Sequence, residues 1–373
     1  MSRTSAASLI ALWIVVATST VLRGGGPGAP IIPGLSPTPT FSVSTVPPNG
    51  DLNPYGVAFV PVGFPNAGLL APGDILVSNF NASSNLQGTG STIVRIDPNG
   101  GQMVFFQGSS GLGLTTALGV LRAGFVLVGN VPTTTPKATC AEAPSGEERG
   151  VELGSLLILD QQGHLAASLK NRQFLDGPWD LTIHDSGTTA QVFVSNVLSA
   201  TVTRLDLRIN PGGQLAVVQA TQIASGYARR CDPAALVVGP TGLALDPKSD
   251  TLYVASTGDN AIYAVPNAMT ATTDQGTGAV LIQDVHLHGP LALAQAPNGD
   301  LITAQGDAVN PDPKQPSEIV EYTAAGTFVA QRPINAALGS AFGLALGSSG
   351  GSLRFAAVDD ALNVLDIWIV STQ

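Results

Sequence analysis

The stretch GPTGLALDPKSDTLYVASTGDNAIYAVPNA, residues 239–268, decides the fold. It contains the short apolar runs LAL, LYVA and AIYAV, separated by turn formers such as Gly, Pro, Asn and Asp. Short apolar runs bounded by such residues predict β-strands joined by tight turns. One unit of this kind cannot bury its apolar faces alone, so further copies are expected along the chain.

The unit recurs along the sequence. Its opening run appears six times, as NPYGVAF from Asn53, TALGVL from Thr116, GPWDLTI from Gly177, GPTGLAL from Gly239, GPLALAQ from Gly289 and AFGLAL from Ala341. A second and a third apolar run follow each copy, and five copies continue through a turn into a fourth run. Four short strands repeated in this way predict an all-β fold, a six-bladed β-propeller with four-stranded blades.

The sixth unit lacks its fourth run, because the chain ends at IWIVSTQ. The β-rich run FSVSTVP, from Phe41, has no partner in its own neighbourhood. We therefore expect this N-terminal strand to complete the last blade and close the ring, which leaves no blade edge unpaired. A β-sandwich or a β-helix is the alternative, but neither accounts for the repeated four-run unit.

Composition supports this architecture and excludes one class of partner. The 373 residues include 43 Gly and 27 Pro, which disfavour long helices, and only 11% are charged. The net charge is −10, and Lys and Arg are scattered without a basic run. A nucleic-acid partner is therefore not expected.

The N-terminus predicts export. Residues 1–19 carry Arg3 followed by an apolar stretch too short to span a bilayer, as in a secretory signal peptide, although an uncleaved anchor is the alternative. Residues 20–40 are rich in Gly and Pro and predict an extended tether. Residues 41–373 form the propeller. The expected location is the periplasm or the exterior of a bacterial cell, with no membrane insertion of the mature domain.

Two cysteines, Cys140 and Cys231, lie in long insertions of the repeat pattern. The strand order places both insertions on the face that carries the connections from one blade to the next. They belong to neighbouring units, so we expect them to lie close together. In an oxidising compartment we expect a disulfide that pins the insertion over the channel mouth. Two free thiols are the alternative.

The unit at residues 239–268 resembles an NHL-type repeat, with P-x-G-L-A opening the inner strand and L-Y-V-A closing the second. The chain is similar to secreted bacterial NHL-like six-bladed propellers, a group near the SMP-30/gluconolactonase and YncE-like propellers. It departs from the usual repeat because Ala261 stands where Arg or Lys is common. The resemblance implies a fold and leaves the ligand open.

Polar residues at the ends of the second strands are the first candidate site. They are Asn79, Asn130, Asn196, Ser256, Gln305 and Asp359. In a propeller these strands end at the channel mouth, so the six side chains are expected to form a ligand-binding ring there. Capping of turns by side-chain to backbone hydrogen bonds is the alternative.

The segment LDGPWD, residues 175–180, supplies the second candidate. It resembles the E-G-P-x-W segment in which SMP-30-like lactonases place a metal-binding carboxylate, and Asp176 matches that Glu. The resemblance implies a divalent cation such as Ca²⁺, held by Asp176, Asn196 and Asp359. Turn formation and packing of Trp179 is the alternative.

No nucleophile elbow, H-E-x-x-H or phosphate-binding glycine loop is present, so we assign no catalytic residue and enzymatic activity stays uncertain, leaning to none. The first interpretation is a binding or interaction module that uses its loop-rich face, as a monomer, toward a protein or small-molecule ligand. The alternative is a metal-dependent hydrolase or lactonase of the SMP-30-like type.

Overall fold

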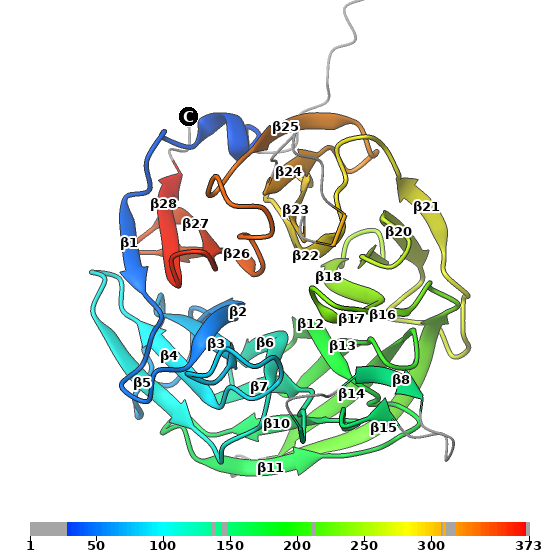
Figure 1. Ribbon diagram of the computed structural model, residues 1–373, viewed down its shortest axis with the longest axis horizontal. Helices are drawn as coiled ribbons and strands as arrows, with labels where there is room; N and C mark the ends of the chain where they lie inside the picture. Colours follow the sequence, from blue (N-terminus) through cyan, green and yellow to red (C-terminus); the bar gives the residue numbers. More distant parts are fainter. Residues whose placement is uncertain are drawn as a thin grey trace, which may run out of the picture.

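Each repeat folds into one four-stranded antiparallel sheet, and the six sheets stand around a common axis (Figure 1). The computed structural model describes residues 28–135, 139–142, 148–210, 214–306, 309–310 and 318–370. The predicted six-bladed β-propeller is confirmed. Strands of four to twelve residues dominate, since the frequent Gly, Pro and Asn residues end each apolar run in a turn.

The first three blades follow the first three repeats. Blade 1 is β2 (Leu52–Phe59), β3 (Ile75–Asn81), β4 (Thr92–Ile96) and β5 (Gln102–Gln107). Blade 2 is β6 (Leu114–Leu121), β7 (Phe125–Asn130), β10 (Ser155–Leu159) and β11 (Leu165–Leu169). Blade 3 is β12 (Pro178–Asp185), β13 (Thr189–Asn196), β14 (Thr201–Asn210) and β15 (Gln214–Ser225).

The other three blades complete the ring. Blade 4 is β18 (Pro240–Asp246), β19 (Thr251–Ser256), β20 (Ala261–Pro266) and β21 (Ala279–Ile282). Blade 5 is β22 (Pro290–Gln295), β23 (Leu301–Gln305), β24 (Ile319–Tyr322) and β25 (Phe328–Arg332). Blade 6 is β26 (Leu344–Ser349), β27 (Ser352–Asp359), β28 (Val364–Val370) and β1 (Phe41–Ser44).

Strand β1 closes the ring as predicted. It lies antiparallel to β28, with Phe41 opposite Ile367 and Ser44 opposite Val364. The outer edge of β28 is thereby paired by a strand from the other end of the chain, so blade 6 is as complete as the others.

The segment before β1 also packs on the ring. Residues 28–40 belong to the stretch for which the sequence predicts an extended tether, but Ile31 and Ile32 are buried between blades 5 and 6. Their backbone N–H groups donate to the two carboxylate oxygens of Glu321, at 2.8 and 2.7 Å. The indole N–H of Trp368 donates to the Ser36 carbonyl at 3.2 Å. These contacts fasten the segment, which includes the 3₁₀ turn η1 (Ile32–Gly34), across the seam between two blades.

The hydrophobic core is divided among the seams. Each pair of neighbouring blades encloses its own cluster of buried aliphatic and aromatic side chains. Inner strands approach closely at these seams. A Cβ atom on Gly343 of blade 6 would lie 2.0 Å from the Tyr55 carbonyl oxygen of blade 1, so only glycine fits there.

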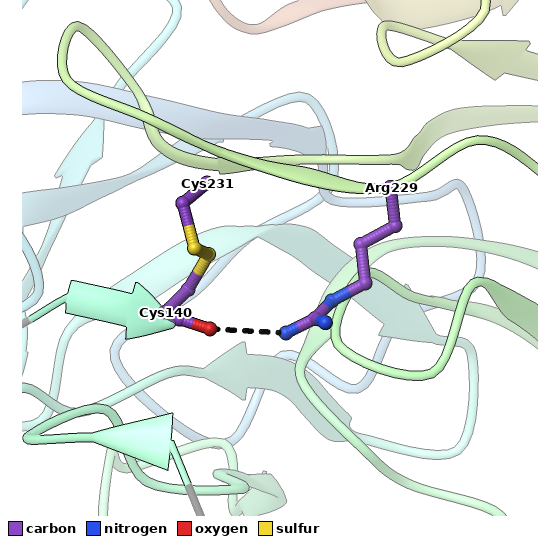
Figure 2. Close-up of a disulfide and its surroundings, with 3 residues drawn as sticks. All are labelled: Cys140, Arg229 and Cys231. Atoms are coloured by element: carbon purple, nitrogen blue, oxygen red, sulfur yellow. Dashed lines mark hydrogen bonds between the residues drawn. A yellow bond between two sulfur atoms is a disulfide. The ribbon is translucent and has the colours of Figure 1, made fainter. Parts of the chain in front are cut away.

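Two hairpins inserted into the repeat pattern are joined by the predicted disulfide (Figure 2). One is β8 (Thr139–Glu142) with β9 (Glu148–Arg149), and the other is β16 (Arg230–Asp232) with β17 (Leu236–Val238). Cys140 and Cys231 are bonded with their Cα atoms 5.4 Å apart, and Arg229 donates to the Cys140 carbonyl at 3.4 Å. The disulfide prediction is confirmed.

The disulfide indicates an oxidising compartment. In the described part of the chain, no helix has the length and apolar character needed to cross a membrane. The expected signal peptide, residues 1–19, lies outside the described residues, so export stays a prediction.

Candidate functional site

The central channel is plugged at the end where the inner strands begin. Tyr55 of blade 1, Trp179 of blade 3 and Phe342 of blade 6 meet there, together with Phe80 from the end of β3. Ring centroids lie 4.8 Å apart for Tyr55 and Phe342, 5.1 Å for Tyr55 and Phe80, and 5.5 Å for Phe80 and Trp179. We call these four residues the aromatic plug.

The disulfide-linked hairpin β16–β17 covers the plug. Leu236 and Val237 are buried in the same cluster as the four rings. The turn of the hairpin reaches blade 1, where Gln87 Nε2 donates to the Ala234 carbonyl at 2.9 Å. The hairpin leaves the ring between blades 3 and 4, so this contact shows that it crosses the mouth on the loop-rich face.

Below the plug the channel widens into a cavity of about 300 Å³. Thr116, Thr241 and Leu291 stand in blades 2, 4 and 5 where Tyr55, Trp179 and Phe342 stand in the other blades. The residue after each of these six is small in five blades: Gly56, Ala117, Gly242, Ala292 and Gly343. In blade 3 the equivalent residue is Asp180. The next residue along each inner strand is aliphatic and borders the cavity, while its side chain packs into the hydrophobic cluster of a blade seam. This aliphatic collar consists of Val57, Leu118, Leu181, Leu243, Leu293 and Leu344.

The cavity opens on the face opposite the long loops. Along β12, Trp179 is 1% exposed and Leu181 is 7% exposed, whereas Thr182 and the residues after it are half-buried. The same rise in exposure occurs toward the ends of β18 and β22. Solvent therefore reaches the cavity from the carboxyl ends of the inner strands, while the plug seals their amino ends.

Asp180 is the one ionisable residue among the described residues that line this cavity. One carboxylate oxygen accepts from the Leu181 N–H at 2.8 Å, and the other accepts from the Leu243 N–H of blade 4 at 3.0 Å. Burial raises the pKa of Asp180 well above its usual range, although both N–H donors favour the charged form. The result is a fixed carboxyl group between the aromatic plug and the aliphatic collar.

The predicted ring of strand-end residues is buried and bound to backbone. Asn196 Oδ1 accepts from the Asp176 N–H at 3.1 Å, and its Nδ2 donates to the Phe174 carbonyl at 3.2 Å. The others make comparable local bonds: Asn79 to Thr45, Asn130 to Leu112, Ser256 to Asp259, Gln305 to His286 and His288, and Asp359 to Asn335 and Leu362. Most of these bonds fasten the loop that enters the same blade, and none of the six lines the cavity. Their ligand-binding role stays a prediction.

The predicted metal donors are not gathered in one place. Asp176 and Asn196 belong to blade 3, whereas Asp359 belongs to blade 6. Asn196 Oδ1, the atom of this side chain that could bind a cation, accepts from the Asp176 N–H at 3.1 Å. Over the part of the chain that the structure describes, no group of three or more His, Cys, Asp and Glu residues could hold a metal ion. These residues do not fit a calcium shell, so we derive no step through a cation.

Asp180 was not selected by the sequence reasoning, although it lies in the same LDGPWD segment as Asp176. The signal that could have found it is its place in the repeat. GPWD in the third unit aligns with GPTG in the fourth, so Asp180 stands where the fourth unit has Gly242. The other five blades have Gly or Ala at this position, so an Asp there departs from the repeat and indicates a separate role.

No protein-family model and no curated protein sequence matches the chain. Solved structures do match. A gluconolactonase from Xanthomonas campestris aligns with a TM-score of 0.52 at 12% identity, covering 92% of this chain and 98% of its own. A luciferin-regenerating enzyme aligns with a TM-score of 0.51 at 8% identity, covering 88% of this chain and 94% of its own. The chain therefore has the six-bladed propeller fold of gluconolactonase-like structures, and at these identities the likeness extends to the fold alone.

Proposed function

We propose that the chain is a hydrolase of small cyclic esters whose active site is the channel cavity, with Asp180 as its acid–base group. The observation that carries this proposal is a single buried carboxyl group, held by two backbone N–H groups, at the closed end of the channel cavity. A buried ionisable group with a raised pKa in a concave pocket is a common feature of active sites. The gluconolactonase fold adds lactones as the first substrates to test.

The chemistry follows from the position of Asp180. As a carboxylate, Asp180 removes a proton from a water molecule while the water oxygen adds to the ester carbonyl carbon. The ring C–O bond then breaks, and the leaving oxygen takes the proton back from Asp180. One water is consumed and one hydroxy acid is formed. Burial raises the pKa of Asp180, which makes this carboxylate a stronger base than an exposed one.

Two backbone N–H groups fix the orientation of the Asp180 carboxylate. The N–H groups of Leu181 and Leu243 hold both carboxylate oxygens, so the group needs no side-chain reorganisation before it reacts. Each oxygen keeps a second lone-pair direction for water or substrate.

The test compares lactone hydrolysis by the native chain and by Asp180→Ala. The variant installs the residue type that blades 2 and 5 already carry at this layer, so we expect it to fold. Loss of a general acid–base group should lower kcat by about 10²-fold or more. The control Asp246→Asn changes a carboxyl group at the end of β18 that does not line the cavity and should retain activity. Equal rates in all three proteins would refute the proposal.

A second candidate is the binding module on the loop-rich face. It is supported by the disulfide between the two hairpins, because a rigid surface loses less conformational entropy when it binds. The test is capture of proteins from the cells that express the chain, with the native form and with a variant lacking both cysteines. Capture that requires the disulfide, by a chain that hydrolyses no lactone, would favour this candidate.

A further inference from the structure

We infer that Ser195 is a positioning residue for Asp180, although its own side chain does not line the cavity. The inference rests on the proposed function, because Asp180 is the group that the proposed reaction uses. Ser195 lies on β13 and is fully buried. Its hydroxyl joins blade 3 to blade 4 beside Asp180.

The ladder between β12 and β13 is irregular beside Asp180. Its register shifts between Pro178 and Asp180, so that Asp180 stands opposite Ser195. Here the Ser195 hydroxyl oxygen accepts from the Asp180 N–H at 3.0 Å. The same hydroxyl donates to the Thr241 carbonyl of blade 4 at 2.7 Å. One side chain therefore ties the backbone of Asp180 to the neighbouring blade.

The same strand of blade 4 supplies a donor to the Asp180 carboxylate. Leu243 lies two residues further along β18 than the carbonyl that Ser195 binds, and its N–H donates to one carboxylate oxygen at 3.0 Å. Ser195 thus sets the spacing of blades 3 and 4 where Leu243 meets Asp180. Blade 2 holds the other side, since the Thr116 hydroxyl donates to the Trp179 carbonyl in the peptide group before Asp180. Such support keeps a reacting group in one position.

The pKa of Asp180 responds to this geometry. Burial raises the pKa, whereas the N–H groups of Leu181 and Leu243 lower it. If blade 4 moves away, the Leu243 N–H interacts less strongly with the carboxylate and the pKa of Asp180 rises further. By holding the two blades together, Ser195 therefore increases the fraction of Asp180 that is present as the carboxylate, the form that removes a proton from water.

Blade 1 offers a matched control. Ser78 accepts from the Gly56 N–H at 2.9 Å and donates to the Thr115 carbonyl of blade 2 at 2.8 Å. Ser78 is also fully buried, and Gly56 takes the place of Asp180 in the repeat. The two serines make the same link between neighbouring blades, but only Ser195 holds a residue with a carboxyl group.

The experiment titrates the full chain, with its aspartates labelled with ¹³C, by NMR and identifies Asp180 from the signal that is lost in Asp180→Asn. Ser195→Ala installs the residue type that blades 4 and 5 carry at this position, Ala255 and Ala304, so we expect it to fold. Ser195→Gly is a second variant without the hydroxyl, and both should raise the pKa of Asp180. Ser78→Ala should leave that pKa at its native value, with a comparable fall in Tm. The conservative Ser195→Thr keeps the hydroxyl and should retain the native pKa.

Lactone hydrolysis supplies the second measurement. Ser195 does not line the cavity, so loss of its hydroxyl should lower kcat by about 10-fold to 100-fold with little change in KM. The rise of kcat with pH follows formation of the Asp180 carboxylate. It should move to higher pH in Ser195→Ala and stay in place in Ser78→Ala.

The outcomes separate this inference from the proposed function. An Asp180 pKa that is unchanged in both variants without the hydroxyl, or that rises equally in Ser78→Ala, would overturn the positioning role. Hydrolysis that requires Asp180 but keeps the native kcat and pH profile in Ser195→Ala would also overturn it and leave the hydrolase standing. A further rise of the pKa confined to the Ser195 variants, with no lactone hydrolysed by the native chain, would support the positioning role and refute the hydrolase.

Discussion

Removal of the Cys140–Cys231 disulfide should destabilise the native propeller by a calculable amount. The bond closes a loop with a sequence separation of 91 residues. The chain-entropy estimate for a loop of that length is about 4 to 5 kcal/mol of unfolding free energy. With an unfolding entropy of about 2 cal/mol/K per residue over roughly 340 residues, the expected fall in Tm is roughly 6 °C.

The assay is thermal unfolding of the native chain and of the double variant Cys140→Ala with Cys231→Ser, followed by circular dichroism. Alanine suits position 140 because Cys140 is 1% exposed in an apolar cluster, where a hydroxyl group would add a separate cost. The native chain treated with reductant is the matched control and should melt like the double variant. The hairpin β16–β17 should also become the first site of proteolysis in the variant, because its attachment to the other hairpin is lost. A Tm equal to that of the oxidised native chain would refute the view that this bond links two otherwise separate loops.

Three further changes test other parts of the structure. Gly343→Ala should lower the unfolding free energy by about 3 kcal/mol or more in urea titration, because its Cβ would strike a neighbouring carbonyl, while Gly34→Ala, with no atom within 4 Å, should change little. Deleting residues 41–47 should cause aggregation or a large fall in Tm, because β28 loses its partner, and native-like melting would place ring closure elsewhere. Asp180 binds its proton more tightly in the folded chain, so its contribution to stability is complete below the unfolded pKa of about 3.9 and is lost as pH rises through the folded pKa. The Tm of the native chain minus that of Asp180→Asn should therefore fall as pH increases above about 4, and a constant difference would contradict the raised pKa.

The sequence was sufficient for the fold because the signal is repeated. Each blade alone is a weak pattern, but six copies and an unpaired β-rich run near Phe41 leave few arrangements open. The docking of the preceding segment could not be predicted in this way. The Gly and Pro content of this segment predicts only its local backbone conformation. Its docking on the ring depends on a hydrogen bond to Glu321, which is 290 residues from Ile31 in the sequence.

The candidate site was less predictable, and the reason is side-chain direction. The second strand of each blade ends near the loop-rich face, but an Asn at such a position can point toward the channel or toward the loop beside it. In Asn196 the amide bonds to the entering loop, and aromatic rings such as Trp179 occupy the channel instead. A residue-by-residue alignment of the six repeats would have singled out Asp180, because the other five repeats have Gly or Ala at the aligned position.

The closure of blade 6 has a consequence for the order of folding. Strand β1 cannot pair until β28 has been synthesised, because Phe41 lies opposite Ile367. Through nearly the whole of synthesis the chain therefore carries the alternating strand FSVS without its partner, and an incomplete chain exposes two open edges. Joining contacts so distant in sequence is slow relative to local hairpin formation. Ring closure therefore waits until β28 is available, and β1 stays open to wrong pairing until then.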